Sequence, residues 1–231
     1  MEKKETLWLI PARGGSKGIP DKNFKPFCGE SLVSRAVRQA LECCGDNDTV
    51  FVSTDSPAIK AEAERHGVWV PFLRPDDLAS DTASTNDVIL HVIEKFENIG
   101  VGFQNIVLLQ PTSPFRTTED ILGAKSIWNP GIDMVVSVTA SSSNPYYNLF
   151  ETDAEGFLQI SKGAGNFTRR QDAPKVWEYN GAVYVITTES IRKQPLSAFK
   201  KRVAYEMPGS RSIDLDTPRD WEIAEIIFNK K

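Results

Sequence analysis

The chain alternates short apolar runs with segments of helical periodicity, and this alternation restricts its fold more than any other feature. Runs of strand length occur at residues 7–10, 49–53, 68–70, 105–109 and 134–138. Apolar residues at helical spacing follow at residues 31–41, 58–65, 85–96 and 118–128. Strands that alternate with helices predict an α/β fold with a mostly parallel sheet. Ligands of such sheets bind at the carboxyl ends of the strands.

Capping residues predict where the helices begin and end. Ser31 is expected to cap the first helix. Pro57 suits the first turn of the second helix, and Gly67 suits its end. After the interruption described next, the pattern predicts strands at residues 182–186 and 203–206 and a last helix at residues 218–228.

The alternation stops between about residues 139 and 176, where Ser, Asn, Gly and aromatic residues dominate. Residues 157–160 are predicted to form part of a hairpin there. We interpret this stretch as an insertion into a single domain that spans residues 1–231, acting as a flap, as a contact between subunits, or as both. Aromatic side chains clustered in a polar stretch are typical of interfaces, which predicts a homodimer. These aromatic residues are Tyr146, Tyr147, Phe150, Phe157 and Phe167.

Charge and composition exclude several classes of partner. The net charge of −4 and the pI near 5.4 argue against nucleic-acid binding, but not against a small anionic substrate. No apolar run approaches the roughly 20 residues that span a bilayer, so no membrane association is expected. The first five residues lack the basic and apolar stretches of a secretory signal, and we expect a cytoplasmic protein. The cysteines, Cys28, Cys43 and Cys44, form neither a disulfide framework nor a metal set.

A loop rich in glycine and proline follows the first apolar run directly, at residues 11–20. Glycines let backbone amides approach an anion, while Arg13 offers a planar fork of donors and Lys17 a mobile charge. The loop is neither a P-loop nor a dinucleotide fingerprint. It is predicted to hold a triphosphate, and the alternative is a glycine turn with solvated basic residues. The predicted phosphate-site residues are Arg13, Gly14, Gly15, Ser16, Lys17, Lys22 and Asn23.

Six segments, taken in order, resemble the acylneuraminate (CMP-sialic acid) cytidylyltransferase family over essentially the whole chain. They are Ile10–Asn23, Val52–Asp55, Leu73–Thr82, Leu108–Arg116, Asn180–Val185 and Ser212–Thr217. The resemblance implies a Rossmann-like nucleotide-diphospho-sugar transferase fold and a dimer formed through the insertion. It also implies that CTP gives up CMP to a sialic-acid-like nonulosonic acid, with release of pyrophosphate. Arg13, Lys17, Lys22, Asp214 and Asp216 are the catalytic candidates in that reaction.

The same resemblance assigns further residues to the substrates. It places Arg74, Ala83 and Thr85 at the cytosine and Gln110 and Tyr184 at the sugar acid. Arg170, shortly before the Asn180–Val185 segment, is a further candidate for the sugar site, as a partner for the sugar carboxylate or for the triphosphate. From the residues alone, Arg74 could equally form a surface salt bridge and Thr85 could cap a helix. Gln110 could simply fasten the loop that follows it, Arg116 could anchor that loop or face solvent, and Tyr184 could be an ordinary strand aromatic.

Asp214 and Asp216 are predicted to hold a metal ion. In an extended segment, residues two apart project to the same face, and two carboxylates there repel each other unless a cation joins them. Mg²⁺, or Mn²⁺ in its place, suits carboxylates together with phosphate oxygens. The family resemblance implies the same role. The alternative is that Asp216 or Thr217 caps the last helix.

One departure from the family concerns the sugar. Some members specific for N-acetylneuraminate carry a basic residue after the Met134–Val138 run, whereas Asn144–Asn148 here contains no Lys or Arg. This favours another nonulosonic acid, such as a legionaminic- or Kdn-like sugar. Two other interpretations stay open: a nucleotidyltransferase for a different sugar acid or alcohol, and a non-catalytic module that binds CMP-sugars.

Overall fold

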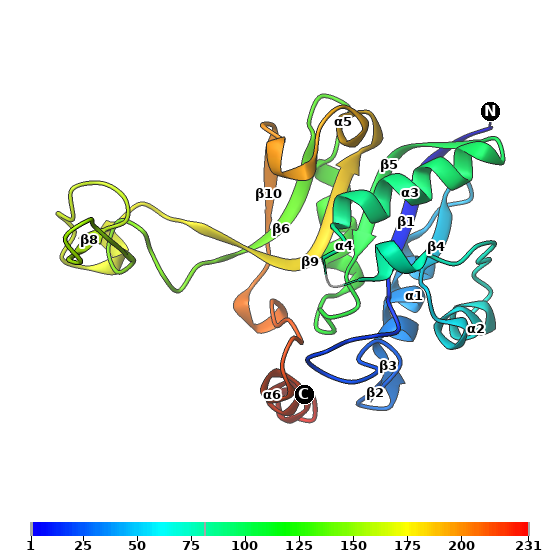
Figure 1. Ribbon diagram of the computed structural model, residues 1–231, viewed down its shortest axis with the longest axis horizontal. Helices are drawn as coiled ribbons and strands as arrows, with labels where there is room; N and C mark the ends of the chain where they lie inside the picture. Colours follow the sequence, from blue (N-terminus) through cyan, green and yellow to red (C-terminus); the bar gives the residue numbers. More distant parts are fainter. Residues whose placement is uncertain (1, 81, 231) are drawn as a thin grey trace.

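The computed structural model describes residues 2–80 and 82–230. A six-stranded sheet lies at its centre, with strand order β10-β6-β9-β5-β1-β4 (Figure 1). All strands run parallel except β9, which is antiparallel to both of its neighbours. The predicted mostly parallel α/β sheet is therefore confirmed. The strands are β1 (Glu2–Pro11), β4 (Thr49–Ser53), β5 (Val101–Leu109), β6 (Met134–Ala140), β9 (Trp177–Thr187) and β10 (Arg202–Glu206).

Helices cover both faces of the sheet. One face carries α3 and α5, and the other carries α1 and α4 (Figure 1). The buried segment of β1 from Leu7 to Ile10 lies between these layers and forms the centre of the apolar core. The helices are α1 (Leu32–Cys43), α2 (Pro57–Arg65), α3 (Thr85–Asn98), α4 (Thr118–Ile127), α5 (Thr188–Lys193) and α6 (Pro218–Phe228). None of the helices among the described residues is long and apolar enough to cross a membrane.

The capping predictions hold where a side chain can satisfy the first free amides of a helix. The Ser31 side chain accepts a hydrogen bond from the Ser34 amide and caps α1. Pro57 is the first residue of α2, as predicted, although Ser56 supplies the capping oxygen. Gly67 follows α2 with a φ of +84°, a conformation that favours glycine at the end of a helix.

The strand predicted at Val68–Val70 is wrong. Both valines are buried, but the segment forms no ladder with a neighbouring strand. The Val68 amide donates instead to the Ala63 carbonyl, and the Lys60 Nζ donates to the Val70 carbonyl at 2.7 Å. Helix α2 uses the polar backbone groups that a strand would need, so the apolar run packs as irregular chain.

A second, smaller apolar cluster lies beneath the loops that follow the sheet. It packs the end of the glycine-rich loop against α1, the segment before α6, and α6 itself. A short hairpin of β2 (Pro26–Phe27) and β3 (Glu30–Ser31) contributes Phe27 to it. The rings of Phe27 and Trp221 meet edge to face at 5.3 Å. The cluster therefore fixes two loops that are distant in sequence against each other.

Residues 141–176 leave the sheet between β6 and β9 and form an arm that projects far from the core (Figure 1). The hairpin predicted around residues 157–160 is present as β7 (Phe150–Thr152) paired with β8 (Leu158–Ile160). Its apolar side chains face solvent: Phe150 is 53% exposed, Phe157 67% and Leu158 68%. Tyr146, Tyr147 and Phe167 are half-buried within the arm.

Candidate active site

A cavity of about 340 Å³ lies at the carboxyl ends of β1 and β5. Four separate segments of the chain meet there. Most of the residues predicted to bind the nucleotide line the wall of this cavity. Its cationic side chains come from the glycine-rich loop and from Arg74. The predicted residues in the wall are Arg13, Ser16, Lys17, Lys22, Asn23, Arg74, Ala83, Thr85, Gln110 and Asp216.

Hydrogen bonds from outside the loop hold the start of the glycine-rich loop. The side-chain amide of the buried Asn23 donates to the backbone carbonyl of Arg13 at 2.9 Å. The Gly14 amide donates to Oδ1 of Asp55 at the same distance. Gly14 and Gly15 lie outside the cavity lining, although both were predicted in the phosphate site. Because the backbone amide of Gly14 donates its hydrogen bond to the Asp55 carboxylate, Gly14 anchors the loop in this structure.

Gly18 allows the closest approach in the site, and our sequence analysis did not select it. A Cβ added at this position would lie 2.5 Å from the backbone carbonyl oxygen of Asp216. Only glycine lets the glycine-rich loop and the acidic segment come this close without a shift of the backbone. The glycine spacing of the loop was visible in the sequence, but its partner 198 positions away was not.

Lys22 connects the same two segments through its side chain. Its Nζ donates to the Leu215 carbonyl at 2.7 Å and to Oδ1 of Asp216 at 3.1 Å. The Lys22 side chain is only 13% exposed, whereas Asp216 is open to the cavity and solvent. A cation is thereby held at the edge of the cavity nearest to the acidic pair.

Arg74 is buried, so the alternative of a surface salt bridge is wrong. Its Nη2 donates to the Ser53 carbonyl at 2.6 Å, and its Nε donates to the Ser53 hydroxyl at 3.1 Å. Burial lowers the pKa of Arg74 to about 10, which leaves it protonated at neutral pH. Ser84 caps α3, so the capping alternative for Thr85 is also wrong. Both side chains line the cavity instead.

Two further recesses lie beyond the cationic cavity, and both are lined by Tyr184. One, of about 370 Å³, shares Thr85 and Gln110 with the cationic cavity and reaches Tyr184 on β9. The other, of about 560 Å³, lies across Tyr184 and carries Asp214. Burial raises the pKa of the Tyr184 hydroxyl, which therefore stays protonated and can donate a hydrogen bond. The predicted sugar-site residues Gln110 and Tyr184 thus line one recess beside the cationic cavity.

The segment from Ser212 to Asp216 presents its two carboxylates away from the core. Leu215 between them is buried, and its amide donates to the Thr112 carbonyl at 2.9 Å. Asp214 is accessible from its recess but surrounded by protein on its other sides. This burial raises the pKa of Asp214, and the nearby Asp216 carboxylate raises it further. Asp216 is not the cap of α6, because Thr217 caps that helix in a capping box with Asp220.

The donors of Asp214 and Asp216 fit a hard divalent cation such as Mg²⁺ or Mn²⁺. Their charges interact, and a cation between the two carboxylates would relieve that repulsion. Within residues 2–80 and 82–230, no three or more His, Cys, Asp and Glu side chains gather to hold a metal. The remaining ligands of an ion there would be phosphate oxygens and water, which is the coordination that Mg²⁺ prefers.

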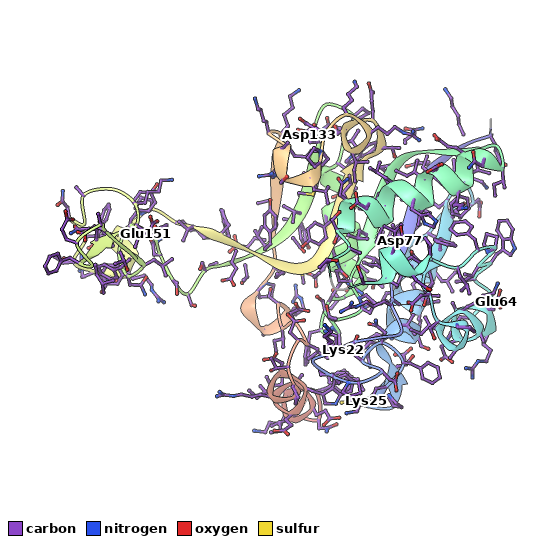
Figure 2. The ribbon with its side chains drawn as sticks, in the orientation of Figure 1. Lys22, Lys25, Glu64, Asp77, Asp133 and Glu151 are labelled. Atoms are coloured by element: carbon purple, nitrogen blue, oxygen red, sulfur yellow. The ribbon has the colours of Figure 1, made fainter. Side chains whose placement is uncertain are left out.

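Arg170 is the predicted sugar-site residue that lies away from these cavities. It belongs to a short 3₁₀ turn of the arm, is exposed, and donates to the Ser142 carbonyl. Figure 2 shows the separation of the two regions, with Glu151 on the arm and Lys22 at the core. Within one chain, the structure therefore does not bring Arg170 to Gln110 or Tyr184.

Comparisons with known proteins agree with this geometry. The sequence profile of the cytidylyltransferase family matches residues 7–208. The CMP-N,N'-diacetyllegionaminic acid synthase of Legionella pneumophila is 34% identical over 229 residues, covering 95% of this chain and 94% of that protein. The N-acylneuraminate cytidylyltransferase of Streptococcus agalactiae serotype V is 32% identical over 93% of this chain and 51% of its own length.

A solved structure shares the fold over nearly the whole chain. It is a CMP:2-keto-3-deoxy-manno-octonic acid synthetase complexed with CTP, with a TM-score of 0.70. The match covers 98% of this chain and 99% of that chain at 17% sequence identity. This likeness confirms the predicted α/β fold.

Proposed function

Because the chain belongs to the cytidylyltransferase family, we propose that it transfers CMP from CTP to the anomeric hydroxyl of a sialic-acid-like nonulosonic acid, releasing pyrophosphate. The cationic cavity that ends at Asp216 carries this proposal. It combines cationic side chains that suit phosphates with the Asp216 carboxylate, and it shares Thr85 and Gln110 with a second recess. A module that only binds CMP-sugars would need no such meeting of phosphate-binding cations and carboxylates.

The nucleotide occupies the cationic cavity in this proposal. Arg13 and Lys17 hold the β- and γ-phosphates and stabilise the leaving pyrophosphate, since charged hydrogen bonds to phosphate are strong. Lys22, fixed on the Leu215 carbonyl, lies beside the α-phosphate. Arg74, Ala83 and Thr85 take the cytosine, with Arg74 donating to the base carbonyl. These groups bind and orient, which is how proteins accelerate most phosphoryl transfers.

The acceptor lies along the wall formed by Gln110 and Tyr184. From there its anomeric hydroxyl attacks the α-phosphorus in line with the departing pyrophosphate. We propose that the acceptor is a legionaminic-acid-like sugar. Two observations support this choice: residues 144–148 carry no basic side chain, and one relative that matches along nearly its whole length is named for N,N'-diacetyllegionaminic acid.

Asp214 and Asp216 would hold Mg²⁺ in this scheme. The ion, when bound, would neutralise phosphate charge and lower the pKa of the attacking hydroxyl. The Lys22 ammonium already neutralises part of the Asp216 charge. In this scheme the two carboxylates face the α-phosphate. Thr217 caps α6 and so holds them just before the helix begins.

We further propose that the protein is a homodimer whose arm reaches the neighbouring subunit. The exposed apolar hairpin of Phe150, Phe157 and Leu158 supports an interface, because removing such an apolar surface from water lowers the free energy of the system. The arm would carry Arg170 to the acceptor side of the partner's site. Since CTP is a metabolite of the cytoplasm, we also assign the enzyme to that compartment.

Pyrophosphate release tests the proposal directly. Purified protein is mixed with Mg²⁺, one nucleoside triphosphate and one acceptor from a panel that includes N,N'-diacetyllegionaminic acid, N-acetylneuraminic acid, Kdn and Kdo. Release that requires CTP and a nonulosonic acid is the expected result. Equal rates with UTP, or turnover with Kdo alone, would favour a nucleotidyltransferase for a different sugar acid. CTP binding without turnover on any acceptor would favour a binding module.

A further inference from the structure

Arg116 is a buried arginine whose hydrogen bonds, in the described part of the chain, go to neutral oxygen atoms. Arg116 is 3% exposed, and burial lowers the pKa of its guanidinium to about 10, so the guanidinium remains charged at neutral pH. Burying a charge is costly unless its donors are satisfied. The donors of Arg116 are satisfied by the hydrogen bonds described next, which also determine where their acceptors lie.

The guanidinium of Arg116 joins three elements. Its Nη1 donates to the Gln110 carbonyl at 2.9 Å and to the Ala182 carbonyl at 2.7 Å. Its Nε and Nη2 donate to Oε1 of Gln39 on α1, at 3.2 and 3.0 Å. Gln39 in turn donates to the Arg116 carbonyl at 2.6 Å. The planar fork of arginine makes this set of bonds possible, whereas a lysine offers a single point of donation.

These contacts lie where two strands separate. The β5–β9 ladder ends at the pair Leu109 and Val183. Gln110 follows the last residue of β5, whereas Ala182 lies within β9, which continues along β6. The Arg116 Nη1 bridges the carbonyls of Gln110 and Ala182 and so extends the connection between the two segments by one residue beyond the ladder. It thereby fixes the backbone of Gln110, whose side chain lines both the nucleotide cavity and the adjoining recess.

The same bridge reaches the acidic side of the site. Gly181, next to Ala182, has a φ of +73° and lies against Asp214, since a Cβ added there would be 3.8 Å from Oδ2 of Asp214. The position of the Ala182 carbonyl therefore influences the wall that Asp214 occupies. Arg116 thereby connects Gln110, in the wall of the first recess, with the neighbour of Gly181, in the wall of the recess that carries Asp214.

We propose that Arg116 is a positioning residue, which acts through Gln110 to set the geometry of the acceptor site. This inference rests on the proposed function, because it takes Gln110 to contact the acceptor. Arg116 itself touches no substrate. Its loss should change how the acceptor is bound and oriented while leaving the phosphate loop and the Arg74 contacts as they are.

Arg116→Lys is the first variant to measure. It keeps the charge and loses the fork. We expect kcat/KM for the acceptor to fall about tenfold or more, the loss typical when a positioned reacting group shifts by a fraction of an ångström. The dissociation constant for CTP, measured by calorimetry, should stay within about twofold. Arg35→Lys is the matched control, since Arg35 is a largely buried arginine packed over Phe228 and paired with Glu30. It should leave acceptor kinetics unchanged.

A double-mutant cycle with Gln110→Ala decides whether Arg116 acts through Gln110. If it does, adding Arg116→Lys to Gln110→Ala should lower acceptor kcat/KM less than about twofold further. Independent, multiplying losses in kcat/KM would overturn the inference, and so would a lower melting temperature with unchanged kcat/KM per folded molecule. Should Arg116→Lys fail to fold, Gln39→Met serves in the same cycle, because it removes the acceptor of the fork and leaves Arg116 in place.

The proposed function can fail separately. If Gln110→Ala has no effect on an enzyme that turns over normally, Gln110 is not an acceptor contact, and this overturns both that assignment and the inference. If Gln110→Ala lowers kcat/KM for the acceptor, and Arg116→Lys lowers it by an independent factor in the double variant, only the inference about Arg116 is overturned.

Discussion

The ammonium of Lys22 lies 3.1 Å from the carboxylate of Asp216, although the two residues are 194 positions apart in the chain. Because Asp216 is exposed, this ion pair contributes little to the free energy of unfolding. Its consequence is one of placement. Lys22 brings positive charge from the glycine-rich loop to the acidic segment, so that cations and carboxylates meet at one end of the cavity before any ligand arrives.

Gly18→Ala tests how closely these two segments must approach. The added Cβ would lie 2.5 Å from the Asp216 carbonyl, and the contact is with backbone, which yields only if the loop moves. We expect kcat/KM to fall by about two orders of magnitude, because a shift of about 1 Å in a positioned group has that effect. Steady-state kinetics with varied CTP would measure it. Gly45→Ala, whose Cβ would meet its nearest neighbour at 3.8 Å, is the control and should behave as wild type.

Arg13→Ala and Lys17→Ala test the phosphate assignment. Each removes a cation that lines the cavity. A hydrogen bond to a charged group contributes about 1.5–3 kcal/mol, so the dissociation constant for CTP should rise roughly tenfold to a hundredfold in each variant. Calorimetry without acceptor would measure this change. Lys200→Ala, an exposed lysine outside the cavity, should leave the constant unchanged. An unaltered affinity in Arg13→Ala would remove that residue from the phosphate site.

Local signals in the sequence were sufficient for most of the fold. Ser31 was assigned as a cap from its own side chain and the periodicity that follows it, and β4 was predicted with its observed ends. These features depend on neighbours within a few residues. Val68–Val70 failed for the opposite reason: whether an apolar run becomes a strand depends on which backbone groups remain available, and there α2 had taken them.

The candidate site was predictable only where one motif supplied a whole feature. Arg13 and Lys17 were selected from the glycine-rich loop alone, and both line the cavity, while their contact with phosphate stays a prediction. Gly18 and Arg116 could not be selected in the same way, since their meaning depends on Asp216 and Ala182 in distant segments. Arg170 was grouped with the sugar site from its charge and its place in the sequence, and a single sequence cannot say that the arm carries it away from its own core.

Phe157→Glu together with Leu158→Glu tests the role of the arm. Both side chains are highly exposed on the hairpin, so charge there should not disturb the folded chain itself. If the hairpin contacts a second subunit, the buried charges would be costly, and light scattering at micromolar concentration should change from dimer to monomer. Turnover should fall in parallel, because Arg170 would no longer reach a partner's site. A wild-type protein that is already monomeric would contradict the proposal.

Asp214→Asn and Asp216→Asn test the metal assignment at nearly constant side-chain volume. Each substitution removes one negative charge and one hard oxygen ligand. The phosphates then lose part of their charge neutralisation as the transition state forms, and losses of this kind cost about 10²–10³ in kcat. We expect both variants to keep the wild-type melting temperature and to lose turnover to this extent. Rates measured across a Mg²⁺ titration should show a higher Mg²⁺ requirement for any activity that remains.

Thr217→Ala separates this chemical role from a structural one. Thr217 is the residue that follows Asp216, and its side chain caps α6 by accepting a hydrogen bond from the backbone amide of Asp220. Removing the cap should cost about 1 kcal/mol of stability, visible as a lower melting temperature, while most of the turnover remains. The aspartate variants should show the reverse pattern. If instead Asp214→Asn and Asp216→Asn melt early and turn over normally at low Mg²⁺, the two carboxylates serve the start of α6, and the metal site must lie elsewhere.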